Sequence, residues 1–212
     1  TSIAFLIFFI DHTARSIRAS SIVERAAHDT LDHIDKLFPE MIGQPAEEAG
    51  RVAALPTTPP ATITTEEAGY LQNVDEDALS DLADKGRLTV KMERHIGEFI
   101  PPGSALASVW PPEAVDDSIV RDVRRALVLG PERSMEQDAE FGITQLVDIA
   151  VKALSPGIND PTTAKICIDR LAEILVVLGN RAMPPVLRTD DAGRLLFMAR
   201  RTTFERAVEL AF

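Results

Sequence analysis

The sequence has few of the residues on which several familiar kinds of site depend. It contains one cysteine, one tryptophan and one tyrosine among its 212 residues. A single cysteine, Cys167, excludes an intrachain disulfide framework and a multi-thiolate metal site. Its position between Ile166 and Ile168 is typical of a small buried side chain. The shortage of aromatic residues leaves little for a base-stacking surface or an aromatic ligand cage.

Basic residues are also scarce relative to acidic ones. The chain has 22 Lys and Arg against 33 Asp and Glu, which gives a formal net charge of −11 at pH 7. Such a chain repels a phosphate backbone, and no cluster of basic residues interrupts the acidic balance. We therefore expect no nucleic-acid partner.

The sequence lacks the spacings of well-known catalytic and metal-binding motifs. It contains no P-loop, GxSxG or GxGxxG sequence, and its four histidines do not follow a metal-ligand spacing. We predict no metal site, and the sequence identifies no cofactor.

What the chain does have is an almost wholly apolar start, residues 1–10. This stretch covers about half of a bilayer core, which needs ~20 helical residues, and it has no polar face of the kind that a surface helix shows. We interpret it as the end of a transmembrane helix truncated before residue 1, and the alternative is a buried terminal helix. Arg15 and Arg18 follow, and basic residues beside a membrane span tend to lie on the cytoplasmic side.

The remaining chain divides into three regions by its periodicity. Residues 11–55 predict a membrane-proximal helical segment, residues 61–112 a small β-rich subdomain, and residues 116–212 a helical subdomain with a C-terminal hairpin. The expected fold class is α+β, mainly helical. The expected helices are 16–38, 45–55, 75–85 with Gly86 as its cap, 119–127, 135–154, 161–178 and one from Thr203; the expected strands are 61–65, 88–92, and two hairpins within 97–110 and 186–198.

Polar residues gather in two segments, the first of which is 133–142. Spacings of three and four place Asp138, Gly142, Gln145 and Asp148 on one face of the expected helix. This face is either part of a site or simply a solvated surface.

The second polar segment, 155–164, follows twelve residues later. A structural reading is that Asn159 or Asp160 caps the next helix, with Pro161 at its first position. The alternative is an anion site, in which free backbone amides at a helix N-terminus lie beside the hydroxyls of Thr162 and Thr163.

The same two segments, together with Phe99-Ile100-Pro101-Pro102-Gly103, carry a resemblance to a known family. The matching residues run from Glu136 to Ile143, from Gln145 to Ala150 and from Ala153 to Pro161. With them the chain resembles the bacterial predicted-membrane-protein family called domain of unknown function 2254. The resemblance implies several transmembrane helices before a soluble region, and it implies no activity or catalytic residue. The residues that belong to the family's motifs in this sequence are Arg133, Asp138, Asn159, Asp160 and Thr162.

Two classes of function remain open on these observations. The first is a cytoplasmic regulatory or assembly domain of a multi-pass protein of the cell membrane, such as a channel or transporter. Its partners are the lipid bilayer, through preceding helices, and further copies of itself as a homo-oligomer. The alternative is a membrane-tethered enzyme or small-ligand sensor with a site formed by segments 133–148 and 155–163. The candidate binding residues are Arg133, Asp138, Gln145, Asn159, Asp160, Thr162 and Thr163.

Overall fold

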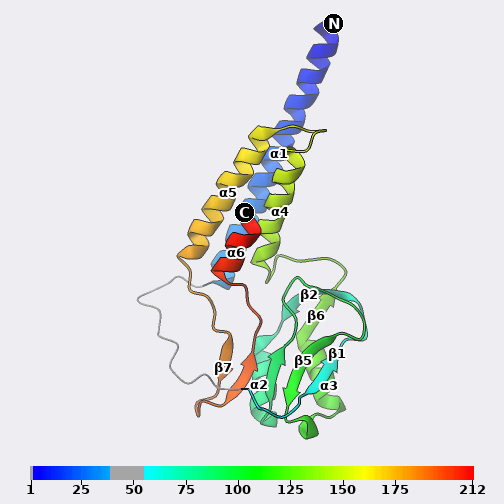
Figure 1. The fold of residues 1–212 in the computed structure, drawn as a ribbon, viewed down its shortest axis with the longest axis vertical. Helices are drawn as coiled ribbons and strands as arrows, with labels where there is room; N and C mark the ends of the chain where they lie inside the picture. Colours follow the sequence, from blue (N-terminus) through cyan, green and yellow to red (C-terminus); the bar gives the residue numbers. More distant parts are fainter. Residues whose placement is uncertain (1, 39–54) are drawn as a thin grey trace. The chain divides into compact units, whose positions relative to one another are not determined.

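A computed structural model describes residues 2–38 and 55–212, and for residues 2 and 8–18 it describes the backbone alone. The chain forms two compact units, and each combines segments that are distant in sequence (Figure 1). The helical unit contains residues 2–38, 139–181 and 203–212, and the β-rich unit contains residues 55–138 and 182–202. The helix expected at 45–55 lies outside the described residues except for its last residue.

The helical unit is built on one long helix, α1, which is continuous over 36 residues from Ser2 to Leu37. The apolar start and the following amphipathic segment therefore belong to a single helix. Val23, Ala27 and Ile34 recur at helical spacing and are buried, so one face of the later part of α1 lies in the unit's core. Among the described residues, no helix has both the length and the apolarity that crossing a membrane requires.

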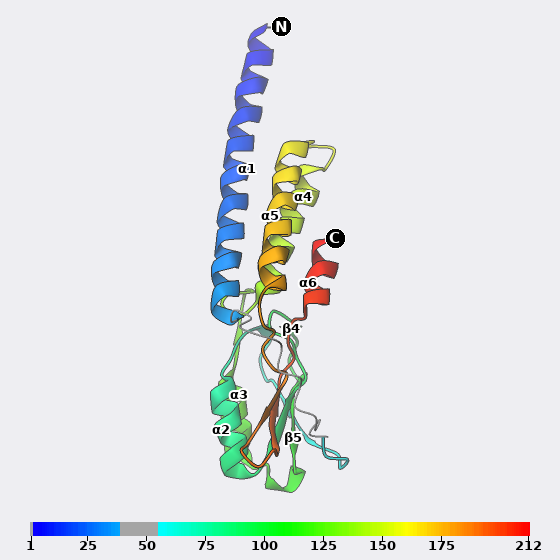
Figure 2. The same ribbon diagram turned by 90° about the vertical axis from the view of Figure 1, so that its left-hand side faces the viewer.

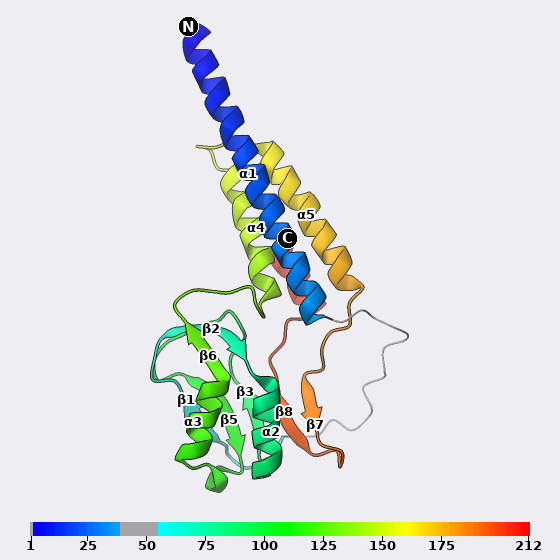
Figure 3. The same cartoon turned by 180° about the vertical axis from the view of Figure 1, so that it is seen from behind.

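Three further helices complete the unit, and Figures 2 and 3 show them beside the later part of α1. They are α4 (Ala139–Ala153), α5 (Pro161–Gly179) and α6 (Phe204–Ala211). The ion pairs Glu24–Arg170 and Asp35–Arg181 show that α1 and α5 run parallel, because both partners advance by the same number of residues. Since a short turn joins α4 to α5, α4 runs antiparallel to both.

The described residues of the β-rich unit form two sheets, two α-helices and one short 3-10 helix. A five-stranded sheet has the order β1-β5-β3-β8-β7, and a three-stranded sheet has the order β4-β2-β6. Alternating burial along β2 and β3 is typical of strands with one face on a core. The strands are β1 (Ala61–Thr64), β2 (Gly69–Val74), β3 (Thr89–Met92), β4 (Phe99–Ile100), β5 (Ala105–Trp110), β6 (Leu127–Gly130), β7 (Leu187–Thr189) and β8 (Leu195–Met198); the helices are α2 (Glu76–Gly86), α3 (Asp117–Ala126) and the short 3-10 helix η1 (Pro112–Ala114).

The α+β class is confirmed, and so is the C-terminal hairpin, whose strands β7 and β8 pair antiparallel. The placement of that hairpin differs from the expected division at residues 61–112 and 116–212. β8 pairs in parallel with β3, through Val90 and Phe197, so the hairpin completes a sheet of the β-rich unit. Helix α3 also belongs to this unit, because its buried Val123 and Ala126 face the same core as the strands.

Three further differences concern individual turns and helix ends. The turn Pro101-Pro102-Gly103 does not close a hairpin, because β4 pairs with β2 while β5 pairs with β1 and β3 in the other sheet. Gly86 ends α2, but the left-handed cap is Arg87, with φ 52°. The helix expected from 135 begins at Ala139, since the residues before it are bonded to β2. β2 was not expected from the sequence.

Candidate functional site

The first polar segment centres on an ion pair between Arg133 and Asp138. Nε of Arg133 donates to Oδ2 of Asp138 at 2.8 Å, and the Asp138 side chain is only 2% exposed. Gly97 lies directly against both side chains with φ +81°, and a Cβ at that position would be 1.9 Å from Oδ2 of Asp138. The pair is therefore covered by a backbone position that tolerates only glycine.

Two glutamines connect the same segment to strand β2 by hydrogen bonds. Oε1 of Gln137 accepts the backbone N–H of Val74 at 2.9 Å, and its Nε2 donates to Oδ1 of Asn73. Nε2 of Gln72 donates to the carbonyl of Glu132 at 2.7 Å. The polar groups of this segment thus hold the chain in place just before α4 begins.

The loop that carries Gly97 is held by its own charged residues. Glu93 accepts hydrogen bonds from Ser108 on β5 at 2.7 Å and from Lys91 on β3 at 3.0 Å. Burial alone would raise the pKa of Glu93, but these hydrogen bonds and the Lys91 charge together hold it below its ordinary value. Glu98 behaves in the same way: burial opposes ionisation, yet the His95 amide and Arg94 lower its pKa.

The second polar segment forms the turn between α4 and α5. Asp160 is the N-cap of α5: its Oδ1 accepts the Thr163 N–H at 3.1 Å and its Oδ2 accepts the Thr163 hydroxyl at 2.7 Å. Pro161 occupies the first turn, and Asn159 has φ 48°, a left-handed conformation that asparagine tolerates. Asn159 and Thr162 are exposed. Asp160 and Thr163 therefore follow the capping interpretation.

The expected polar face of α4 is not one continuous surface. Asp138 precedes the helix, and Gly142 is buried beneath α1, where an added Cβ would be 2.0 Å from Oγ1 of Thr30. Gln145 is half-buried and Asp148 is exposed. The spacing of these residues is helical, but a helix-helix contact interrupts the face that they share.

The structure brings the candidate residues together in two separate groups. Arg133 joins Asp138, and Asp160 joins Thr163, whereas Asp138 and Asp160 lie beyond opposite ends of α4. A helix of 15 residues is about 22 Å long. These two carboxylates are consequently too far apart to act as a direct acid/base pair.

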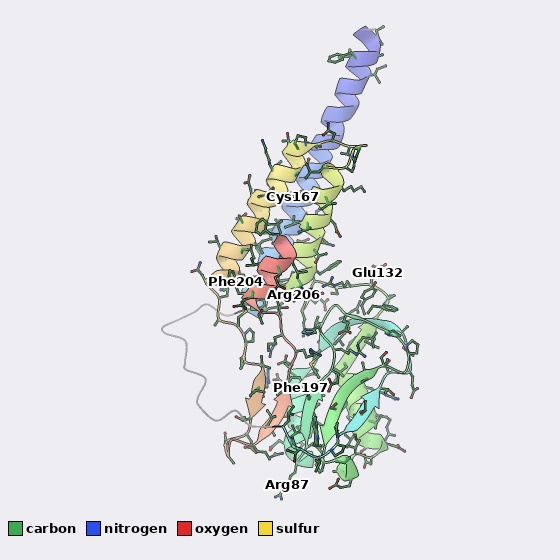
Figure 4. The ribbon with its side chains drawn as sticks, in the orientation of Figure 1. Arg87, Glu132, Cys167, Phe197, Phe204 and Arg206 are labelled. Carbon is green, nitrogen blue, oxygen red and sulfur yellow. The ribbon has the colours of Figure 1, made fainter. Side chains whose placement is uncertain are left out.

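Three residues of this architecture were missed from the sequence: Gly97, Gln137 and Thr30. Each acts on a partner that is distant along the chain, so no local spacing could reveal it. Cys167, in contrast, was read correctly as buried, and Figure 4 shows it among the helices of its unit. Burial raises the pKa of its thiol.

One further depression lies outside the two polar segments among the described residues. This depression, between α2 and α3, is lined by both acidic and basic side chains, including Asp81, Lys85, Asp122 and Arg125, and by none of the candidate residues. Over the ranges 2–38 and 55–212, no three His, Cys, Asp or Glu side chains form a group suited to a metal ion.

Comparison with known proteins identifies the family. A family model described as "Predicted membrane protein (DUF2254)" matches residues 1–212. The chain belongs to this family. This confirms the resemblance carried by the two polar segments, and it supports a membrane location for the DUF2254 protein described here.

Curated relatives of this DUF2254 chain come from mycobacteria. An uncharacterized protein of Mycobacterium bovis is 36% identical over an alignment of 203 residues, which covers 92% of this chain and 38% of the relative. Uncharacterized proteins of two Mycobacterium tuberculosis strains match with the same identity and coverage. The chain thus spans less than two fifths of the length of these relatives. No solved structure matches it.

Proposed function

We propose that this chain is a cytoplasmic domain through which a membrane protein is regulated or assembled, with α1 as its link to the bilayer. The observation that carries the proposal is the two-part character of α1. Near its N-terminus the side chains of Ile3, Phe5 and Ile7 are exposed, and further along Val23 and Ile34 are fully buried in the helical unit. One continuous helix of 36 residues, about 54 Å long, joins the two parts.

The exposed apolar end suits lipid better than water. Phe5 is 70% exposed and Ile3 is 74% exposed, although burying such side chains in an apolar phase is favourable by roughly 1.5–3 kcal/mol each. Arg15 and Arg18 follow along the sequence, and a basic flank favours the cytoplasmic side of a membrane. A rigid helix with these ends can pass a displacement between the bilayer and the helical unit.

The two polar segments favour a structural role over catalysis. Arg133 and Asp138 satisfy each other beneath Gly97, and Asp160 is engaged with Thr163 at a helix cap. Groups bonded in this way fix the chain at both ends of α4. This favours a domain that transmits force or holds a shape, and we propose that role for the family motifs.

Labelling of single cysteines tests the cytoplasmic orientation. In a Cys167→Ala background, Lys85→Cys places a thiol on α2, where the Lys85 side chain is 78% exposed. In cells that carry the protein in their membrane, we expect a membrane-impermeant maleimide to label this thiol only after permeabilisation. Asp117→Cys, on the exposed start of α3, is a second site and should behave alike. Labelling of both in intact cells would overturn the cytoplasmic orientation.

Light scattering coupled to size exclusion tests assembly. We expect the chain to form a defined homo-oligomer, and Ile22, an exposed apolar position on α1, is our candidate contact. Ile22→Asn should then lower the mass, while Val176→Asn, exposed on α5, should leave it unchanged. A monomer at every concentration would remove assembly from the proposal and leave regulation through α1.

A further inference from the structure

We propose that the turn between α4 and α5 is a second membrane contact, which binds the surface of an anionic phospholipid bilayer. This surface is called the α4–α5 tip and comprises residues 151–165. The inference rests on the proposed function, because α1 must direct its N-terminal end to the bilayer. It adds that the helical unit itself touches lipid.

The helical register places the α4–α5 tip close to the apolar end of α1. Pro161 lies nine residues before Arg170, and Arg15 lies nine residues before Glu24, the ion-pair partner of Arg170. Because α1 and α5 are parallel, the start of α5 is level with Arg15. Ile10, at the end of the apolar stretch, is five residues further, a rise of about 8 Å.

The contact between α4 and α1 independently places the α4–α5 tip at a similar level along α1. Gly142 lies against Thr30, and α4 runs antiparallel to α1. Ala153, eleven residues after Gly142, is therefore level with Ala19, eleven residues before Thr30. In Figures 1 and 2 the turn lies at a level part-way along α1, and the N-terminal part of α1 continues beyond that level. A bilayer that receives residues 3–10 has its headgroup region at the α4–α5 tip.

The α4–α5 tip exposes aliphatic side chains at this level. Val151 is 65% exposed, Leu154 is 58% exposed and Ile158 is 46% exposed. Pro156 and Gly157, between the last two, are exposed as well. Apolar side chains that reach ~5–10 Å into the boundary between headgroups and acyl chains anchor a protein at the membrane surface.

The charges of the α4–α5 tip complement anionic lipid, although the chain as a whole carries −11. Within residues 151–165, all of which the structure describes, the exposed ionisable residues are Lys152 and Lys165. Asp160 is buried and bonded to Thr163. Basic residues near an anionic membrane surface strengthen binding electrostatically. Because two such tips repel each other, this local positive charge favours anionic lipid over a symmetric contact with the same tip of a second copy.

A fluorophore at the α4–α5 tip tests the inference on the 212-residue chain. In the Cys167→Ala background, Ile158→Cys, Phe5→Cys and Val176→Cys each carry an environment-sensitive nitrobenzoxadiazole label. Vesicles of phosphatidylcholine with phosphatidylglycerol are added, and vesicles of phosphatidylcholine alone are the comparison. We expect a blue shift at positions 158 and 5, with quenching by headgroup-level spin-labelled lipid at position 158 and by spin labels deep in the acyl chains at position 5, and no response at position 176.

The three labels separate the inference from the function on which it rests. A response at position 5 without one at position 158 overturns the tip contact and leaves α1 as the membrane link. No response at either position overturns both. A concentration-dependent shift at position 158 without vesicles, and no further change when they are added, assigns the α4–α5 tip to a second copy and also overturns the lipid contact.

Substitutions then separate the apolar and charged contributions. Leu154→Asn with Ile158→Asn should weaken vesicle binding about tenfold, because two aliphatic side chains are lost. Lys152→Ser with Lys165→Ser should remove most of the preference for phosphatidylglycerol and its sensitivity to salt. Val176→Asn, exposed on the same unit, is the matched control. Unchanged binding in both double variants contradicts the proposal.

Discussion

Thr30 of α1 lies so close to Gly142 of α4 that a methyl group at position 142 would be 2.0 Å from the Thr30 hydroxyl oxygen. Thr30 is buried, and its hydroxyl donates to the carbonyl of Ala26 at 2.6 Å. The side chain is thus held against the approaching helix. The contact fixes the spacing of α1 and α4, on which the linking role proposed for α1 depends.

Gly142→Ala is expected to destabilise the protein by about 2 kcal/mol, because overpacking outweighs the gain in helix propensity of ~1 kcal/mol. Thr30→Ala in the same chain should restore part of the loss, since it removes the atoms that clash. Chemical denaturation of the four chains of this double-mutant cycle measures the coupling. Gly157→Ala, which meets open space, is the control. Strictly additive effects would contradict this contact.

Gly97→Ala is expected to cost more than 3 kcal/mol, because it combines a left-handed backbone with a clash against Arg133 and Asp138. Gly103→Ala isolates the first effect. Gly103 has φ +80° but no neighbour within 4 Å, so only the backbone penalty of about 1–2 kcal/mol remains. Urea unfolding midpoints compare the stability lost in the two variants. Equal losses would show that the Arg133–Asp138 pair moves aside for the added methyl group at no cost in stability.

Asp160→Ala is expected to lower the free energy of unfolding by about 1 kcal/mol, because α5 loses its cap. Asp160→Asn keeps an acceptor for the Thr163 N–H and should recover most of that loss. Thr162→Ala changes an exposed neighbour and should stay within about 0.5 kcal/mol of the parent. Thermal unfolding distinguishes the three. If Thr162→Ala proves the most damaging, capping is not the main role of this turn.

The lowered pKa of Glu93 predicts a pH dependence of stability. A carboxylate whose pKa is lower in the folded than in the unfolded protein stabilises the fold at a pH above its unfolded pKa. The contribution disappears as the pH falls through the lower, folded pKa. Glu93→Gln should therefore reduce the fall in the free energy of unfolding as the pH is lowered. Glu113→Gln, exposed on η1, should not. An equal fall for Glu93→Gln and the parent would contradict the prediction.

Much of the local structure was readable from the sequence, because periodicity and capping are local properties. The spacing of Val23, Ala27 and Ile34 gave the amphipathic part of α1, and Asp160 followed by Pro161 gave the start of α5. The C-terminal hairpin was found from its two short apolar runs on either side of a turn. These features depend on residues only a few positions apart.

The missing parts depend on contacts between distant residues. Nothing in Leu88–Met92 indicates that β3 pairs with a strand beyond residue 190, and nothing near Pro101 indicates that β4 and β5 enter different sheets. The sequence predicted the two polar segments, but it did not predict the backbone position that covers the ion pair of the first segment. Gly97 lies more than thirty residues from Arg133 along the chain, so only the folded backbone reveals that it closes over the ion pair.

The interleaving of the two units has a consequence for how the protein is made. The free edge of β3 finds its parallel partner only when Leu195–Met198 has left the ribosome, more than a hundred residues later. The apolar face of α1 is likewise covered only after α4, α5 and α6 have been synthesised, about a hundred residues or more later. Each unit needs residues beyond position 181, so a nascent chain carries an open sheet edge and an apolar helix face throughout most of its synthesis. Chaperone protection during translation should matter more for this architecture than for two domains that follow one another along the chain.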